Sequence, residues 1–326
     1  MHCIISDQTD PYFNLASEEV LLKSGREDVF LMYRNRPSVV VGKHQNTLAE
    51  ISLPYVLEHG ILVARRISGG GAVFHDLGNI NFAFITTGKE GDLVNYPKFM
   101  QPVIDAMGKA GLEVNLGERN ELLLGNRKIS GTASHVYKHR VLHHGTLLFS
   151  SDIRSLASAL KVKPGKFEDR AVKSIRSEIT NISEHLVDKM DVVDFQQMIY
   201  GNILDTMDGA TEYHYSRSDL NEIRKLRNSK FSSWQWVFGY SPKYQFNKSL
   251  QTGSGRITIH MNVEKGIIRE VNIEGDFLGI KDIRALEEMI VGSIHDPETL
   301  RQRLSDISVT DYIAGLENET LLSGMF

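Results

Sequence analysis

The stretch Arg65–Phe82, RRISGGGAVFHDLGNINF, places two arginines beside three consecutive glycines. Glycine lets backbone N–H groups approach an anion closely, and the planar arginine fork suits phosphate and carboxylate oxygens. The segment therefore favours a loop that could hold a phosphate. By itself it is also typical of a plain glycine turn between strands with surface arginines, and it matches neither the P-loop nor the dinucleotide fingerprint.

Lys128 is a second candidate, because it stands in a strand-like run just before the small-residue turn Ser130–Ala133. A lysine in such a strand is commonly a solvated residue or a guard against edge-to-edge pairing. Its functional interpretation is an ammonium group held beside a phosphate or carboxylate.

Two further features could carry chemistry. His143 and His144 are neighbours on a predicted strand, so their side chains point to opposite faces and at most one of them faces a site. Glu121, which follows Arg119-Asn120, could hold Mg²⁺ jointly with a nucleotide phosphate, although a solvated loop is the commoner meaning of such a segment.

Composition limits the class of protein. The chain has 326 residues, 41% hydrophobic and 24% charged, which is typical of a soluble globular protein. Its formal net charge of -4 does not suit nucleic-acid coating as a main role, although local basic patches remain possible. Cys3 is the single cysteine, so neither a disulfide framework nor a cysteine metal site is possible. The N-terminus lacks the pattern of a signal peptide, and no stretch approaches 18 apolar residues. We expect a cytoplasmic protein with no membrane or nucleic-acid partner.

Helix-like and strand-like patterns alternate along the chain. Because several strands are joined by loops too short for a crossover helix, we expect an α/β protein whose large domain has mixed, mostly antiparallel sheets with flanking helices. Helices are expected at Tyr12–Lys23, with Asn14 as its cap, and at Tyr96–Ala110, Ser151–Leu160, Val193–Met207 and Leu220–Arg227. Strands are expected at Val29–Tyr33, Ser38–Gly42, Leu62–Arg65, Ala72–Phe74, Asn81–Ile85, Leu122–Leu124, Arg127–Ser130 and Gly145–Phe149.

The last third of the chain predicts a smaller α+β unit. Alternating aromatic residues over Trp234–Phe238 predict a strand that closes the large domain, and Gly253-Ser254-Gly255 has the composition of a hinge-like linker. A boundary near Leu250 then gives a catalytic domain, 1–249, and a C-terminal accessory domain, 250–326. The accessory domain is expected to contain the strands Ile257–Val263 and Ile267–Ile273 and helices near Ile280–Ser293, Pro297–Leu304 and Thr310–Leu316.

Taken together, these segments resemble the lipoate–protein ligase A family. The matching motifs, in the family's order and spacing, are GKHQN at 42–46, RRISGGGAVFHDLGNINF at 65–82, ERNELLL at 118–124, RKISGTA at 127–133 and HHGTLLFSSD at 143–152. The SSWQWVFG segment and the C-terminal unit also look like those of two-domain members, so the resemblance covers nearly the whole chain.

The resemblance implies a biotin/lipoate protein ligase fold and an ATP-dependent, AMP-forming reaction. Lipoate and Mg·ATP would give lipoyl-AMP and pyrophosphate, and a lysine of a lipoyl domain would then attack the mixed anhydride. This is protein lipoylation, by which a cell salvages lipoate. The implied acceptors are the glycine cleavage H protein and the E2 subunits of 2-oxoacid dehydrogenases, and we expect the ligase to be a monomer.

The family motifs also assign residues to roles. Arg66 and Lys128 are the implied catalytic residues, with Lys128 expected to touch both the lipoyl carbonyl and the phosphate. The positions that match the ATP or adenylate site are Arg66, Gly71, Ala72, Val73, Phe74, Asn79, Asn120 and Lys128. The positions that match the lipoate site are Ser68, Gly70, His75, Lys128, Ser130, Gly131, Ala133 and His144.

Two assignments are less direct. Glu121 occupies an implied magnesium position where the family often carries aspartate, so its carboxylate is displaced by one methylene. The lipoyl tail needs an apolar tunnel, and its candidate residues could equally be plain core; they are Leu15, Val39, Val40 and Val41.

Alternatives remain open at this stage. A transferase of the same fold could move lipoyl or octanoyl groups through a cysteine thioester, but Cys3, beside Ile4 and Ile5 in a predicted strand, is more typical of a small core residue. A related transferase would use only preformed lipoyl-AMP. A non-catalytic, lipoate-sensing regulator would be expected to carry a basic recognition helix, which we do not find in this sequence. The preferred acceptor and the choice between octanoate and lipoate cannot be derived from the motifs.

Overall fold

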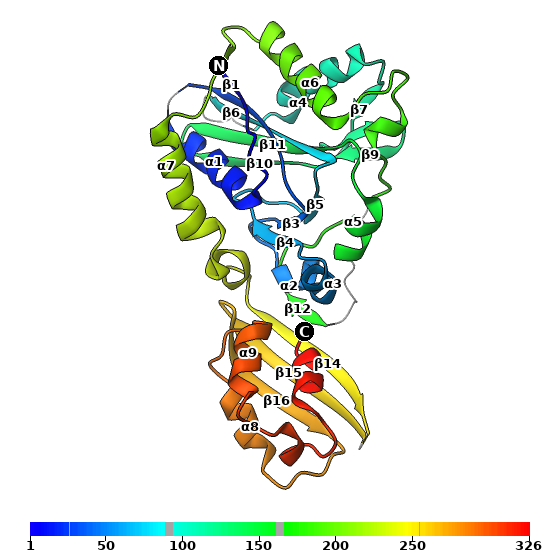
Figure 1. Cartoon of the computed structure of the whole chain (residues 1–326), viewed down its shortest axis with the longest axis vertical. Coiled ribbons are helices and arrows are strands. Elements are labelled where there is room, and N and C mark those ends of the chain that lie inside the picture. Colours follow the sequence, from blue (N-terminus) through cyan, green and yellow to red (C-terminus); the bar gives the residue numbers. More distant parts are fainter. Residues whose placement is uncertain (26, 89–93, 161–165, 176, 254) are drawn as a thin grey trace. The chain divides into compact units, whose positions relative to one another are not determined.

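The computed structural model describes residues 1–25, 27–88, 94–160, 166–175, 177–253 and 255–326 (Figure 1). Its contacts divide the chain into two units. The large unit comprises Met1–Lys43, Tyr55–Leu160 and Ser174–Ser233, and the small unit comprises His44–Pro54, Lys161–Lys173 and Trp234–Phe326.

Helices and strands alternate irregularly along the chain up to residue 231. In chain order they are β1 His2–Ile5, α1 Pro11–Ser24, β2 Val29–Arg34, β3 Ser38–Val41, α2 Thr47–Glu50, α3 Leu53–Glu58, β4 Leu62–Arg65, β5 Val73–His75, β6 Asn79–Thr87, α4 Tyr96–Lys109, β7 Val114–Leu116, β8 Leu122–Leu124, β9 Arg127–Ser130, β10 Thr132–Tyr137, β11 Arg140–Leu148, α5 Ile153–Ala159, β12 Phe167–Asp169, η1 Ile182–Glu184, α6 Val192–Thr206, β13 Thr211–Glu212, α7 Arg217–Leu226 and η2 Arg227–Phe231.

The large unit is built on a six-stranded sheet in the order β10-β11-β6-β2-β1-β13. β1 runs parallel to β2 and β13, whereas the other neighbours are antiparallel. Two three-stranded sheets, β4-β3-β5 and β7-β8-β9, complete the unit. The α/β class with mixed, mostly antiparallel sheets is thereby confirmed.

The two faces of the six-stranded sheet carry different residues. On one face Phe82 and Phe84 of β6 belong to the same buried apolar cluster as Met100 of α4 and Phe195 of α6. On the other face α1 contacts β6 and β11. Side chains alternate along a strand, so each β11 residue faces either the α4 side or the α1 side.

The small unit has an antiparallel sheet with helices packed against it. β14 Tyr244–Thr252, β15 Gly255–Glu264 and β16 Ile267–Gly275 form it together with β12, in the order β12-β14-β15-β16. α8 Ile283–Ile290, α9 Pro297–Leu304, η4 Val309–Asp311 and α10 Asn318–Gly324 follow. The buried residues Ile257, Ile259, Met261 and Val263 alternate along β15, and they join the core with Leu286 and Leu300.

The boundary expected near Leu250 is corrected by this strand. Leu250 pairs with Ile257 within the β14–β15 ladder, and the contacts divide the chain at Trp234 instead. The expected hinge is also wrong, because Thr252 pairs with Gly255 across the hairpin turn between these two strands. Ser254, the middle residue of the expected linker, lies outside the described residues.

The strand expected over Trp234–Phe238 is wrong as well. Gln235–Gly239 forms a π-helical turn, η3. Trp234 stacks on Phe238 with ring centroids 6.0 Å apart, and Trp236 lies 4.7 Å from Tyr240. Aromatic residues at every second position also supply partners four residues apart, and this spacing brings side chains together on a helix.

Three smaller expectations also change. α1 is capped by Asp10, whose side chain accepts the Tyr12 N–H, whereas Asn14 is buried inside the helix. The helix expected at Thr310–Leu316 is reduced to the short turn η4 and is followed by α10, which the sequence did not predict. The edge strand β10 was also missed.

Candidate active site

Arg66 organises the glycine loop between β4 and β5. Its Nε donates to Ser68 Oγ at 3.1 Å, and its Nη2 donates to the carbonyl oxygens of Gly69 at 2.6 Å and Gly71 at 2.7 Å. Gly70 has φ +86°, and a Cβ there would lie 3.0 Å from Arg66 Nη2, so the loop needs glycine at this position. Burial lowers the pKa of Arg66 to about 10, which leaves the guanidinium cationic at neutral pH.

Arg65 holds the neighbouring loop. This arginine is fully buried and donates from Nη1 to the carbonyl oxygens of Gly42 and Lys43, both at 3.0 Å. The Lys43 N–H in turn donates to the Ser68 carbonyl at 2.8 Å. The paired arginines therefore connect two of the sequence motifs through their backbones rather than lying on the surface.

A buried chain of polar side chains lies behind the loop. Ser68 Oγ is 2.6 Å from His144 Nε2, and His144 Nδ1 is 2.9 Å from Glu18 Oε2. A carboxylate can only accept, so Nδ1 of His144 carries the proton in this contact. Tyr33 donates its hydroxyl to Glu18 Oε1 at 2.9 Å, and burial together with the Glu18 charge raises the pKa of Tyr33 well above its usual value.

Sequence motifs predicted Ser68 and His144 but missed Glu18 and Tyr33. The two adjacent histidines point to opposite faces of the sheet, as expected for neighbours on a strand, because His143 stacks on Phe99 of α4 with ring centroids 4.3 Å apart whereas His144 contacts Glu18 of α1. Most residues of α1 are buried, including Glu18, and a glutamate in a helical sequence gives no sign of such burial.

Lys128 approaches the same region from β9. A Cβ on Gly131 would lie 3.8 Å from both Lys128 Nζ and Val73 Cγ1, and a Cβ on Gly70 would lie 4.0 Å from the Cβ of Ala133. The strand turn and the glycine loop therefore lie close together. Burial lowers the pKa of Lys128, while Glu121 opposes and Arg119 reinforces that shift.

Three predicted site residues carry buried polar atoms that lack a hydrogen-bond partner among the described residues. These atoms are His75 Nε2, Asn79 Oδ1 and Ser130 Oγ. Buried polar atoms are satisfied in the great majority of cases. A polar ligand is one explanation of such a concentration at positions that the motifs had already selected.

Other predicted residues are already engaged. The Ala72 N–H donates to Ser174 Oγ at 2.8 Å, and the Asn120 carbonyl accepts from Thr132 Oγ1 at 2.6 Å, with Asn120 at φ 62°. Phe74 is buried. The four residues considered for an apolar tunnel are all 2% exposed or less, namely Leu15, Val39, Val40 and Val41.

Glu121 provides one carboxylate at the edge of this region. Its Oε2 accepts the Arg119 N–H at 2.8 Å, and its Oε1 is 3.6 Å from Arg119 Nε. Within the described parts of the chain, no group of three or more metal-binding side chains comes together. Mg²⁺ is commonly bound by one or two carboxylates together with substrate phosphates, so this donor set fits a magnesium ion held mainly by a nucleotide.

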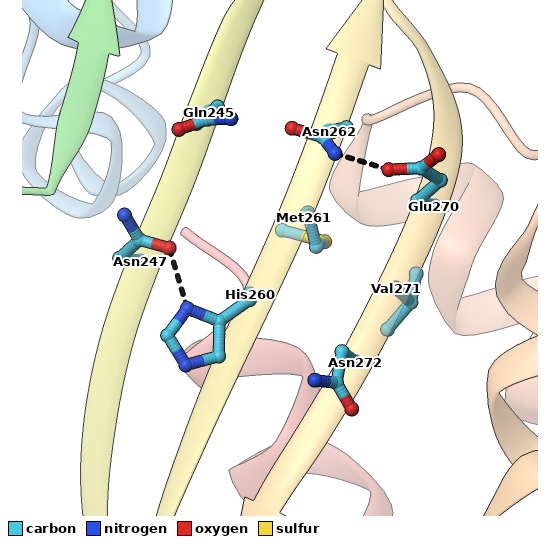
Figure 2. A pocket seen from close by; sticks show the side chains of 8 residues that line it. All are labelled: Gln245, Asn247, His260, Met261, Asn262, Glu270, Val271 and Asn272. Atoms are coloured by element: carbon cyan, nitrogen blue, oxygen red, sulfur yellow. Dashed lines mark hydrogen bonds between the residues drawn. The ribbon is translucent and has the colours of Figure 1, made fainter.

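A hollow in the small unit is unrelated to these motifs. This hollow has a volume of about 190 Å³ and lies on the polar face of its sheet. Figure 2 shows two hydrogen bonds among its lining residues: Asn247 Oδ1 accepts from His260, and Asn262 donates to Glu270. None of the predicted site residues lines it. No helix in the described part of the chain is long and apolar enough to span a bilayer.

Comparison with known families defines the class. The model for the lipoyl protein ligase A/B catalytic domain matches residues 10–203, and the model for the bacterial lipoate protein ligase C-terminus matches residues 241–325. The chain therefore has the catalytic domain of a lipoyl protein ligase followed by the C-terminal region found in bacterial lipoate ligases.

Individual relatives narrow the assignment. The chain is 40% identical to lipoate-protein ligase LplJ of Bacillus subtilis over 317 residues and 40% identical to lipoate–protein ligase 1 of Staphylococcus aureus over 319 residues, with 96% of each chain covered. A crystal structure of lipoate-protein ligase A bound with ATP matches with a TM-score of 0.65 and 25% identity, over 73% of this chain and 98% of that one.

A bipartite lipoate protein ligase from Thermoplasma acidophilum, solved in a study with its E2 lipoyl domain, shares the fold with a TM-score of 0.64 at 23% identity, over 73% of this chain and 96% of that one. The chain belongs to the lipoate–protein ligase A family and is a lipoate–protein ligase.

Proposed function

We propose that the chain joins lipoate to ATP, forming lipoyl-AMP and pyrophosphate, and then transfers the lipoyl group to a lysine of a lipoyl-domain protein. The observation that carries this proposal is the meeting of the Arg66-bound glycine loop with Lys128 and Gly131. The relative with bound ATP supports the nucleotide. The ligase studied with its E2 lipoyl domain supports the class of acceptor.

The first step must bring together a carboxylate and an α-phosphate, which repel each other. Preorganised positive groups offset that repulsion without covalent catalysis. Lys128 lies partly buried at the strand turn and would hold the acyl oxygen and the phosphate. Arg66 would act indirectly, through the glycine loop that its N–H groups hold and through its buried charge.

The remaining motif residues would line the two substrates. Gly71, Ala72, Val73, Phe74, Asn79 and Asn120 are the proposed adenylate contacts, and Ser68, Gly70, His75, Ser130, Gly131, Ala133 and His144 are the proposed lipoate contacts. Mg²⁺ would neutralise phosphate charge, with Glu121 as its proposed protein ligand. The small unit is proposed to be accessory, and the enzyme to work as a monomer in the cytoplasm.

A thioester mechanism has little support from the geometry. Cys3 is fully buried in β1, and burial raises the pKa of its thiol, which opposes formation of the nucleophilic thiolate. A transferase that uses only preformed lipoyl-AMP would retain the same site. Pyrophosphate release from lipoate and ATP separates that enzyme from a complete ligase.

The proposal is tested by incubating the protein with ATP, Mg²⁺ and lipoate, with and without apo H protein and apo E2 lipoyl domains. We expect pyrophosphate release and a lipoyl mass increase on at least one acceptor by intact mass spectrometry. Octanoate in a parallel arm determines the acyl preference. Transfer from supplied lipoyl-AMP without any pyrophosphate release from ATP would instead establish the transferase.

A further inference from the structure

His75 has a buried ring with one satisfied and one unsatisfied nitrogen. It lies on β5, opposite Ser38 of β3, and is 3% exposed. Its Nδ1 is 2.9 Å from Asn35 Nδ2. Its Nε2 is buried and has no hydrogen-bond partner in the described chain.

A chain of hydrogen bonds determines which nitrogen carries the proton. The backbone carbonyl of Gln8 can only accept, so the Asn14 side-chain atom 2.7 Å from it must be the amide nitrogen. The same Nδ2 lies 2.8 Å from Asn35, which must therefore present its Oδ1 there. Asn35 then presents Nδ2 to His75, whose Nδ1 has to accept.

Because Nδ1 accepts, neutral His75 carries its proton on Nε2, the nitrogen without a partner. Burial, together with the charges of Arg66 and His144, lowers the pKa of His75 to about 3. The ring therefore stays neutral across physiological pH and offers a single buried N–H donor. The two charges that act on this ring come from Arg66, in the glycine-loop segment, and His144, on β11.

We propose that His75 donates its Nε2–H to a carboxylate-derived oxygen of the bound lipoyl group, and that Asn35 and Asn14 are positioning residues that keep the proton on Nε2. An orphaned donor beside the Arg66 cation suits an anionic or strongly polar oxygen. The dithiolane sulfurs of the tail are only weak acceptors. The identity of the ligand rests on the proposed function, whereas the location of the proton does not.

The proton location is tested on the free protein by ¹⁵N NMR of the histidine rings, with His75 assigned by comparison with His75→Gln. We expect the Nε2–H tautomer throughout pH 5–8. Asn35→Asp should move the proton to Nδ1, because a carboxylate can only accept. A wild-type ring that is Nδ1–H or doubly protonated at pH 7 would overturn the inference.

Ligand binding is tested with lipoate and isothermal titration calorimetry. His75→Met keeps much of the volume but removes the donor, and we expect a roughly tenfold higher Kd. His75→Gln retains an N–H donor and should stay within about threefold of wild type. Asn35→Asp should weaken binding about as much as His75→Met, and the double variant should add little, because both changes remove one donor.

The outcomes separate the two proposals. Equal lipoate affinity of wild type, His75→Met and His75→Gln would mean that the donor serves only an ordered water, and it would overturn this inference while leaving ligase activity intact. A wild-type protein that neither binds lipoate nor releases pyrophosphate would overturn the proposed function instead. Thermal unfolding of each variant identifies loss of fold.

Discussion

At the scale of single residues, the positive charges of the candidate site have separate tasks. Arg65 and Arg66 direct their donors to backbone and hydroxyl oxygens and so shape two loops. Lys128 stands at the turn where those loops meet β9, with its ammonium near Gly131. Of the three, Lys128 is the cation best placed to respond to charge that develops during a reaction.

Replacement of Lys128 by alanine should therefore reduce lipoate adenylation by about 10²–10³ while leaving the fold intact, since loss of one preorganised donor costs roughly 3–4 kcal/mol in the transition state. Pyrophosphate release in a single-turnover assay measures the loss. Arg127→Ala is the matched control, because it removes an exposed cation from the same strand. Near-normal release by folded Lys128→Ala would contradict the assignment.

Cys3 should be dispensable for the reaction. Cys3→Ala removes a fully buried sulfur from the core and is expected to cost about 1 kcal/mol of unfolding free energy, yet ATP-dependent ligation should persist. Activity and thermal unfolding are measured together. A folded but inactive variant, combined with an acyl-thioester trapped on the native protein, would favour the transferase.

At the scale of elements, α1 contributes more to the site than its pattern indicates. Its Glu18 satisfies Nδ1 of His144 on β11 and the hydroxyl of Tyr33 on β2, and it thereby links one helix to two strands. Glu18→Leu would leave two buried donors unpaired, and we expect a loss of about 2–4 kcal/mol in the free energy of unfolding.

Chemical denaturation measures that loss. Glu58→Leu, at an exposed position on α3, should change stability by less than about 0.5 kcal/mol. The loss of stability in Glu18→Gln should lie between those of Glu18→Leu and Glu58→Leu, because the amide oxygen can still accept a hydrogen bond. A Glu18→Leu protein as stable as wild type would show that the buried chain is not maintained in solution.

Helices and strands could be predicted from the sequence where the spacing of their apolar residues fits only one kind of element. β4, β8, β9 and α9 have the expected bounds, because their apolar residues lie between clear turn or cap residues. The strand predicted over Trp234–Phe238 was wrong because aromatic residues at every second position fit both the alternation of a strand and the four-residue spacing of a helix face. β10 failed because this edge strand, Thr132–Tyr137, is mostly half-exposed and lacks a strong apolar alternation.

The candidate site likewise contains residues that the sequence predicted and residues that it did not. Family motifs selected Lys128, Ser68, His75 and His144, all of which the structure places within the large unit. Asn14, Asn35 and Glu18 were not selected as site residues, because their importance comes from partners that are distant in sequence. A single polar residue in a helix or loop does not indicate what it will meet after folding.

At the scale of the whole molecule, buried neutral histidines make stability depend on pH. In the small unit His295 is 1% exposed, accepts from Tyr244 Oη at 2.7 Å, and donates to the Met325 carbonyl at 2.6 Å. Burial lowers its pKa to about 4. The unfolded chain, with an ordinary histidine pKa of about 6.5, binds the proton first as the pH falls.

The contribution of His295 to stability is therefore complete above about pH 6.5 and declines towards pH 4, by about 1.4 kcal/mol per pH unit. His295→Gln should flatten this part of the pH dependence of unfolding, whereas exposed His214→Gln should not. Urea denaturation at intervals between pH 4 and 7 measures how steeply the free energy of unfolding changes with pH in each protein. Identical slopes for wild type and His295→Gln would contradict a buried neutral ring.

The central claim is that one chain both activates lipoate and transfers it. The most direct measurement is intact mass spectrometry of an apo lipoyl domain after incubation with this protein, lipoate and Mg·ATP, with pyrophosphate measured in the same tube. The account predicts a lipoyl mass increase on the acceptor lysine and at least one pyrophosphate for each group transferred, both of which are lost without ATP and strongly reduced with Lys128→Ala. An unmodified acceptor and no pyrophosphate, with folded protein and a competent acceptor, would contradict it.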